Sequence, residues 1–214
     1  MPETGESKAE RTRRFIIEKS STIFNKKGYA GTSLSDLTNA TGLTKGSIYG
    51  NFKNKDEVAV CAFHHNLAFI IESLASEIDK AETFIEKLLA YPRVYRRNIK
   101  AMIAIGGCPV LNTVIHADNT NDTLRGLAVE TIVNWKRAIM KLVRKGKAAG
   151  EIKVDTDEAM VAENIICLIE GGNAMTKATG EESYLCNAVD QTERIIRAIS
   201  RWFLSTMQIS HGII

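Results

Sequence analysis

Residues 34–49 limit the possible folds of this chain more than any other segment. Helical spacing and capping residues predict two short helices, over residues 34–40 and 44–49, joined by a three-residue turn that contains Gly42. The second helix is too short to be stable alone, so helices on either side must brace it. This arrangement is typical of a helix-turn-helix, in which the second helix enters the major groove of DNA.

The flanking sequence supplies both bracing helices. Apolar residues recur with helical spacing across residues 10–27, and Gly28 follows at a position suited to a left-handed helix end. Downstream, Asn54 caps a helix that we expect to reach about Lys80, with two carboxylates in its first turn, where the helix dipole favours them. The apolar side chains between them are expected to form a small core: Leu34, Leu37, Leu43, Ile48 and Phe52.

Helical periodicity continues through the rest of the chain without a strand pattern or a repeat. An apolar fraction of 44% and only 3 prolines agree with a helix-rich fold that has a sizeable core. Asp155 and Glu158 resemble a capping box at the start of one helix. We therefore expect an all-α protein, with further helices at residues 82–91, 93–105, 109–116, 122–149, 156–178 and 184–207.

The distribution of charge is more informative than the net charge of +3. Up to Lys55 the chain has ten basic and five acidic residues, a balance of +5, whereas the remainder has a balance of −2. A basic end on a near-neutral body is expected when that end meets phosphate, although a solvated basic face is the plainer explanation of charge alone.

Cysteine usage and hydropathy indicate the compartment. The four cysteines form no CxxC pair, which favours a reducing environment. No apolar run approaches the roughly 20 residues that span a bilayer, and residues 1–14 lack the apolar region of a secretory signal. We therefore expect a soluble, cytoplasmic protein.

Catalytic and metal-binding motifs are missing from the sequence. It contains no GxSxG, HExxH, P-loop or GxGxxG pattern. The adjacent residues His64 and His65 point in different directions on a helix and cannot chelate one metal well. We expect no enzyme activity, no metal and no cofactor.

The segment Ile16–Val58 resembles the amino-terminal region of the TetR family of bacterial regulators. It reads IIEKSSTIFNKKGYAGTSLSDLTNATGLTKGSIYGNFKNKDEV. The matching features are Ile17, Phe24, Gly28-Tyr29, Thr32-Ser33, Leu37, Thr41-Gly42-Leu43, Lys45-Gly46-Ser47-Ile48-Tyr49, Phe52 and Lys55. Gly107–Asn112 is also similar to a motif in one branch of the family. The resemblance implies a DNA-binding domain over residues 1–54 and a helical ligand-binding and dimerisation domain over residues 55–214.

The resemblance also assigns DNA contacts position by position. Thr32, Ser33 and Thr44 would hold phosphates, and Lys45 would contact either guanine or a phosphate. Tyr49 would touch the DNA backbone or a thymine methyl group. Asn51 stands where many members have histidine, which puts a backbone contact there in doubt. The implied set is Thr32, Ser33, Thr44, Lys45, Gly46, Ser47, Tyr49, Asn51 and Lys55.

The larger domain would hold an effector pocket and a dimer interface, although each residue could instead belong to the protomer core. Cys108 is either a redox sensor or a buried, inert thiol. The pocket candidates are Phe63, Leu67, Met102, Ile105, Cys108, Asn112, His116, Trp135, Ile166 and Glu170. The interface candidates are Val161, Ile165, Leu168, Ile169, Ile195, Ile199, Trp202 and Phe203.

Taken with the resemblance, these features predict a ligand-responsive transcriptional regulator. The expected partners are a palindromic DNA operator, an unknown small-molecule effector and a second copy of the chain, without a membrane. Repression is the commoner behaviour in the family, but the sequence does not decide between repressor and activator. The alternative is a helical adaptor that binds protein partners without DNA.

Overall fold

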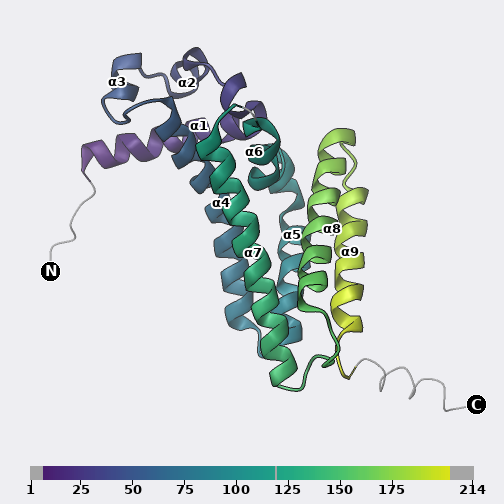
Figure 1. The fold of residues 1–214 in the computed structure, drawn as a ribbon. Coiled ribbons are helices and arrows are strands. Elements are labelled where there is room, and N and C mark those ends of the chain that lie inside the picture. Colours follow the sequence, from purple (N-terminus) through teal and green to yellow (C-terminus); the bar gives the residue numbers. More distant parts are fainter. Residues whose placement is uncertain (1–6, 119, 203–214) are drawn as a thin grey trace, which may run out of the picture. The chain divides into compact units, whose positions relative to one another are not determined.

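The computed structural model describes residues 7–118 and 120–202, which form α-helices joined by short loops (Figure 1). The expected all-α class is confirmed for these residues. The helices are α1 (Lys8–Gly31), α2 (Leu34–Thr41), α3 (Lys45–Tyr49), α4 (Lys55–Lys80), α5 (Phe84–Ile105), α6 (Pro109–Ala117), α7 (Asp122–Ala148), α8 (Glu158–Thr179) and α9 (Ser183–Ala198).

The chain divides into two compact units. The first unit comprises Met1–Phe69 and Ala104–Val129, and the second comprises Ile70–Ile103 and Glu130–Ile214. The first unit therefore contains α6 and the start of α7 as well as the amino-terminal helices. The functional boundary expected after residue 54 lies inside this unit and stays a prediction.

The sequence predicted that α1 ends at Gly28, but the helix continues past this residue. Gly28 has φ 70° and ψ 177°, which breaks the helix locally, and one further turn follows to Gly31. The break brings the backbone close to α6, because a Cβ on Gly28 would lie 2.6 Å from Cβ of His116. The close contact explains why this position needs glycine.

Helix α5 is continuous across Pro92, where we had expected two helices. Proline removes one backbone hydrogen bond and normally kinks a helix. Here its neighbours Leu88, Leu89, Tyr91 and Val94 are all at most 1% exposed, and this packing holds the helix together.

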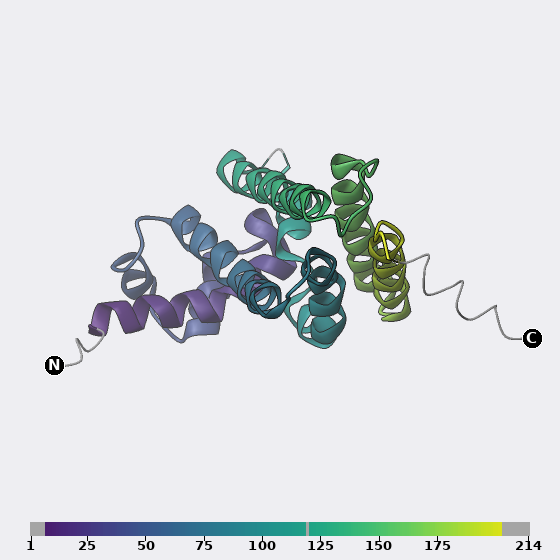
Figure 2. The same cartoon turned by 90° about the horizontal axis from the view of Figure 1, so that it is seen from below.

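Helices α8 and α9 form an antiparallel hairpin and lie side by side in both views (Figures 1 and 2). The first turn of α8 is capped by Asp157, whose carboxylate accepts from the N–H groups of Ala159 and Met160, and not by the expected Asp155–Glu158 pair. Helix α9 ends at Ala198, shorter than predicted, and Ser200 then forms an isolated antiparallel bridge with Ile152.

Helix α4 differs from the expectation that no apolar run is long enough to span a bilayer. It contains an 18-residue window with a mean hydropathy of 1.4, long and apolar enough to cross a membrane by composition alone. A third of that window is buried within the structure. The core helix of a soluble protein passes the same test, so this composition alone does not make α4 a membrane span.

Candidate DNA interface and effector region

Local hydrogen bonds define both helices of the predicted helix-turn-helix. Ser33 caps α2: its hydroxyl accepts from the N–H of Asp36 at 3.1 Å, and the Asp36 carboxylate accepts from the N–H of Ser33 at 2.8 Å. Gly42, with φ 68°, ends α2 in the left-handed region. Thr44 caps α3 by accepting from the N–H of Ser47 at 3.2 Å. The fully buried Ile48 attaches α3 to the core.

The outer face of α3 is open to solvent. Thr44, Lys45 and Gly46 are exposed, and Ser47 and Tyr49 are half-buried. The cap bond uses the Thr44 hydroxyl as an acceptor and leaves its proton able to donate to a phosphate. These five residues form a small, polar, basic surface that can approach base edges and phosphates.

Two of the expected phosphate contacts are already engaged within the chain. Thr32 is fully buried, and its hydroxyl donates to the carbonyl of Gly28 at 2.7 Å, so this side chain is engaged within the chain and a DNA contact through it stays a prediction. Ser33 is exposed, but its hydroxyl donates to Asp36 at 2.8 Å. The hydrogen bond from Lys27, with those from Ser33, lowers the pKa of Asp36 well below its ordinary value. A stable carboxylate beside Ser33 disfavours a phosphate there.

Arg13, which the sequence reasoning missed, holds α3 and α4 against α1. Its guanidinium donates to the backbone carbonyl of Asn51 at 2.5 Å and to the Glu57 carboxylate at 2.7 Å, and it lies 4.1 Å from the centre of the Phe52 ring. Asn51 itself donates from its side chain to the carbonyl of Ser47 at 2.9 Å. Asn51 therefore closes the end of α3, and its contact with DNA stays a prediction.

Lys55 is also positioned by contacts within the first unit. Its ammonium lies 4.2 Å from the centre of the Tyr29 ring, a cation–π contact. Burial lowers the pKa of Lys55, while the charge of Asp56 acts in the opposite direction. Asp56 accepts from the side chain of Asn121, at the start of α7, at 2.7 Å. Asn121 thus connects Asp56, the neighbour of the predicted phosphate contact Lys55, to the loop between α6 and α7.

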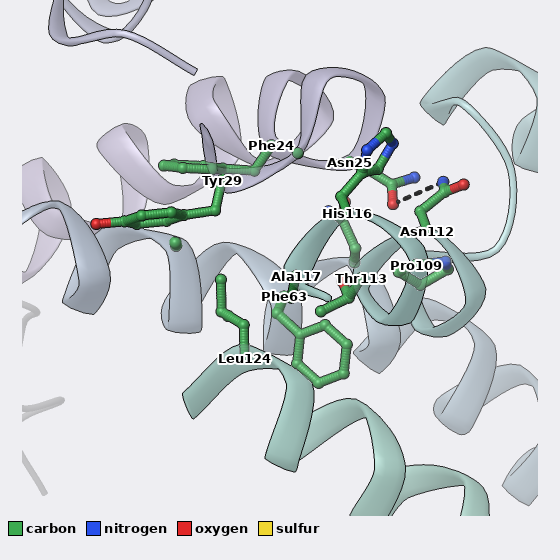
Figure 3. A pocket seen from close by; sticks show the side chains of 13 residues that line it. Phe24, Asn25, Tyr29, Phe63, Pro109, Asn112, Thr113, His116, Ala117 and Leu124 are labelled. Atoms are coloured by element: carbon green, nitrogen blue, oxygen red, sulfur yellow. Dashed lines mark hydrogen bonds between the residues drawn. The ribbon is translucent and has the colours of Figure 1, made fainter. Parts of the chain in front are cut away.

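A small cavity lies between α1, α4, α6 and the start of α7, within the first unit (Figure 3). Its volume of about 20 Å³ has room for a water molecule but not for an organic effector. The lining residues are Phe24, Asn25, Gly28, Tyr29, Ala59, Phe63, Asn66, Pro109, Asn112, Thr113, His116, Ala117 and Leu124.

Two buried asparagines bind the start of α6 to α1. Asn112 donates to the side-chain oxygen of Asn25 at 3.1 Å and to the carbonyl of Gly106 at 2.9 Å (Figure 3). Asn25 in turn donates to the carbonyls of Ile105 at 2.8 Å and Gly107 at 3.0 Å. The loop between α5 and α6 is therefore hydrogen-bonded to the helix that braces the helix-turn-helix.

Comparisons with known proteins agree with this geometry. Residues 16–60 match the family model of bacterial regulatory proteins of the tetR family, and residues 85–192 match that of the tetracyclin repressor-like carboxy-terminal domain. The second match alone covers half of the chain.

The chain belongs to the TetR family. It is 42% identical to a TetR-family transcriptional regulator from Cytophaga hutchinsonii, with a TM-score of 0.85 over 92% of this chain and 99% of that one. A TetR transcriptional regulator from Chloroflexus aurantiacus is 32% identical, with a TM-score of 0.84 over 90% of this chain and 98% of that one. The HTH-type transcriptional repressor DhaR of a Mycobacterium species is 21% identical over 74% of this chain and 79% of DhaR. As a TetR-family member, the chain is a ligand-responsive transcriptional regulator.

The effector residues expected for this TetR-family chain fall into separate groups. Phe63, Asn112 and His116 line the small cavity of the first unit. Leu67, Ile105 and Cys108 belong to the same unit without lining it, and Cys108 is 3% exposed. The remaining candidates belong to the second unit: Met102, Trp135, Ile166 and Glu170. Their role in binding an effector stays a prediction.

The predicted dimer surface of α8 requires correction. Val161, Ile165 and Ile169 are at most 2% exposed, so they pack inside their own chain and are not available to a partner. Leu168, Ile195 and Ile199 are half-buried, and Trp202 is 69% exposed. Phe203 lies outside the described residues. The exposed residues of α8 include Met160, Glu163, Asn164, Cys167, Gly171 and Met175.

The asparagine pair gives a first testable prediction. Replacing Asn112 with alanine leaves the side-chain oxygen of Asn25 and the carbonyl of Gly106 without this buried donor, and we expect the free energy of unfolding to fall by about 1–3 kcal/mol. Urea denaturation measures this change. Asn98→Ala is the matched control, because the Asn98 side chain donates only locally, to the carbonyl of Val94 at 2.9 Å. Equal destabilisation by the two substitutions would contradict a special role for the pair.

Proposed function

We propose that this regulator is a repressor that binds a palindromic operator as a dimer and is released when a small molecule binds to its helical domain. The exposed face of α3, with Lys45 and Tyr49 presented by a braced helix, carries the proposal. The names of relatives support repression, since DhaR is a transcriptional repressor and the 30% identical IcaR of Staphylococcus epidermidis is a negative regulator. A regulator of this kind acts on the chromosome, in the bacterial cytoplasm.

The test is binding of the purified protein to DNA flanking its own gene, measured by fluorescence anisotropy across a salt series. We expect tight binding to a palindromic fragment that weakens as salt increases, because phosphate contacts release counterions. No sequence preference at any salt, with the protein intact in solution, would favour the adaptor alternative and overturn the proposal.

The same assay tests the residues on α3. Tyr49→Ala and Lys45→Ala should each weaken operator binding by about 10- to 100-fold, the effect of losing one good contact in the groove. Lys100→Ala removes the same charge as Lys45→Ala from an exposed position on α5 and serves as the control. A comparable loss in the control would show that α3 is not the reading element.

A dimer accounts for the apolar residues left in solvent on α8 and α9. Met160 is 55%, Met175 46% and Tyr184 43% exposed, and they lie on the outer faces of the hairpin. Two such hairpins can pair as a four-helix bundle. A two-fold dimer would also place two α3 helices roughly 34–36 Å apart, one turn of DNA, as a palindrome requires.

A further inference from the structure

Three aromatic rings stack in the second unit, on helices α5 and α7. Tyr91 and Tyr95 lie one turn apart on α5 and are 1% and 3% exposed. Their ring centres lie 6.4 Å and 6.0 Å from that of Trp135 on α7, with interplanar angles of 18° and 8°. These rings form an aromatic wall, the type of surface that binds apolar groups and organic cations.

Two buried N–H donors in the same unit are unsatisfied. Within the described part of the chain, Nε1 of Trp135 and Nδ2 of Asn173 have no hydrogen-bond partner, and Asn173 is only 4% exposed. Leaving such a donor unpaired in the interior is costly, so buried donors usually have a partner. Both groups are therefore suited to a ligand that carries a hydrogen-bond acceptor.

Glu170 contributes a carboxyl group to this interior. Both of its carboxylate oxygens are buried, and it lies one turn from Asn173 on α8. The ion pair between Lys136 and Glu163, at 2.5 Å, shows which side of α8 meets α7. Glu170 follows Glu163 by seven residues, two helical turns, and therefore lies on that same side.

Contacts with α9 show which turns of α5 and α8 lie at the same height along the helices. Ile99 of α5 packs in one cluster with Leu185 of α9, and a Cβ on Gly172 of α8 would lie 3.0 Å from Cα of Leu185. Ile99 is one turn beyond Tyr95, and Gly172 lies between Glu170 and Asn173. Glu170 and Asn173 are thus about one turn from the level of Tyr95.

We infer that the interior between α5, α7 and α8 binds a small organic cation that has an alkylated ammonium group and a hydrogen-bond acceptor. The ammonium lies against the aromatic wall and is neutralised by Glu170, while the acceptor receives the N–H groups of Trp135 and Asn173. The inference rests on the proposed function, since it names the class of effector for that regulator.

Two probes of matched shape test whether the site prefers a positively charged ligand. The first is 3-hydroxyphenyltrimethylammonium, and the second is its neutral counterpart 3-tert-butylphenol. Both are titrated into the full-length Trp202→Phe protein, which leaves Trp135 as the only tryptophan, and indole fluorescence reports binding. We expect the cation to bind at least about tenfold more tightly than the neutral probe.

Matched variants then test the residues. Glu170→Gln should remove the preference for the cation, whereas Glu163→Gln, which removes the same charge from an exposed position on the same helix, should preserve it. Asn173→Leu should weaken both probes, because both contain the hydroxyl acceptor. Comparing the two probes on otherwise unaltered protein needs no substitution in the site, so a variant that fails to fold does not prevent the test.

Equal affinity for the two probes, a cation preference that survives in Glu170→Gln, or no binding of either probe at millimolar concentration would overturn the inference. Operator binding by the same samples without probe keeps this result separate from the proposed function. Operator binding without cation preference rejects only the ligand class, whereas loss of sequence-specific DNA binding rejects the regulator itself.

Discussion

Replacing Gly28 with alanine is expected to lower the free energy of unfolding by about 2–5 kcal/mol. Two effects combine at this position. At φ 70° and ψ 177° the backbone occupies a region that is almost restricted to glycine, and the new Cβ would lie 2.6 Å from Cβ of His116. The overlap would force α6 away from α1, so urea denaturation should show a large loss of stability and the operator assay a loss of affinity.

A second substitution separates the two effects. His116→Gly removes the side-chain atoms that a Cβ at position 28 meets, so the double variant should recover the part of the loss that comes from overlap. The part due to backbone strain should remain. His116→Gly alone serves as the control for the cost of glycine in α6, about 1 kcal/mol. Purely additive effects of the two substitutions would show that α1 and α6 do not meet through this contact.

The helix-turn-helix could be predicted from the sequence because its determinants are local. Thr44 bonds to a group three residues away, Gly42 ends its own helix, and Asn54 accepts from the N–H of Glu57 at 2.9 Å, so each cap is visible within a few residues. Buried Leu37 and Ile48 follow directly from helical spacing. Local rules and the final packing agree in this part of the chain.

The contacts that hold this motif to the rest of the first unit could not be predicted in the same way. Arg13 and Asn51 are 38 residues apart in sequence, and Asn25 and Asn112 are 87 residues apart. Nothing in the local pattern distinguishes Asn25 from any other polar helix residue. The partner of Thr32 was equally hidden from local rules, since the family resemblance pointed to phosphate, whereas the break at Gly28 leaves a carbonyl that accepts its hydroxyl proton.

The dimer surface of α8 was predicted wrongly for a related reason. A helix with apolar residues on more than one side does not reveal which stripe faces its own chain, and the sequence favoured the stripe that contains Val161 and Ile165. Close contact with α9 shows that the side of α8 that carries Gly172 packs inside the chain. The neighbouring Gly171 then belongs to the exposed side.

These two adjacent glycines give the second prediction of large effect. A Cβ on Gly172 would lie 2.8 Å from Cβ of Ala188 and 3.0 Å from Cα of Leu185, so Gly172→Leu must separate α8 from α9. We expect the free energy of unfolding to fall by about 3 kcal/mol or more. A Cβ on Gly171 would meet nothing within 4 Å, and Gly171→Leu should therefore stabilise the isolated helix by about 0.8 kcal/mol.

The same pair tests where the dimer forms. If the outer face of α8 meets its counterpart in a second chain, Gly171→Leu places a large side chain in that interface and should produce monomers in sedimentation, while each protomer keeps its helical circular dichroism. Gly172→Leu should instead lower the unfolding midpoint at every protein concentration. Because dimer stability depends on concentration and protomer packing does not, urea denaturation at two protein concentrations separates the effects. An intact dimer in Gly171→Leu would place the interface on another surface of the chain.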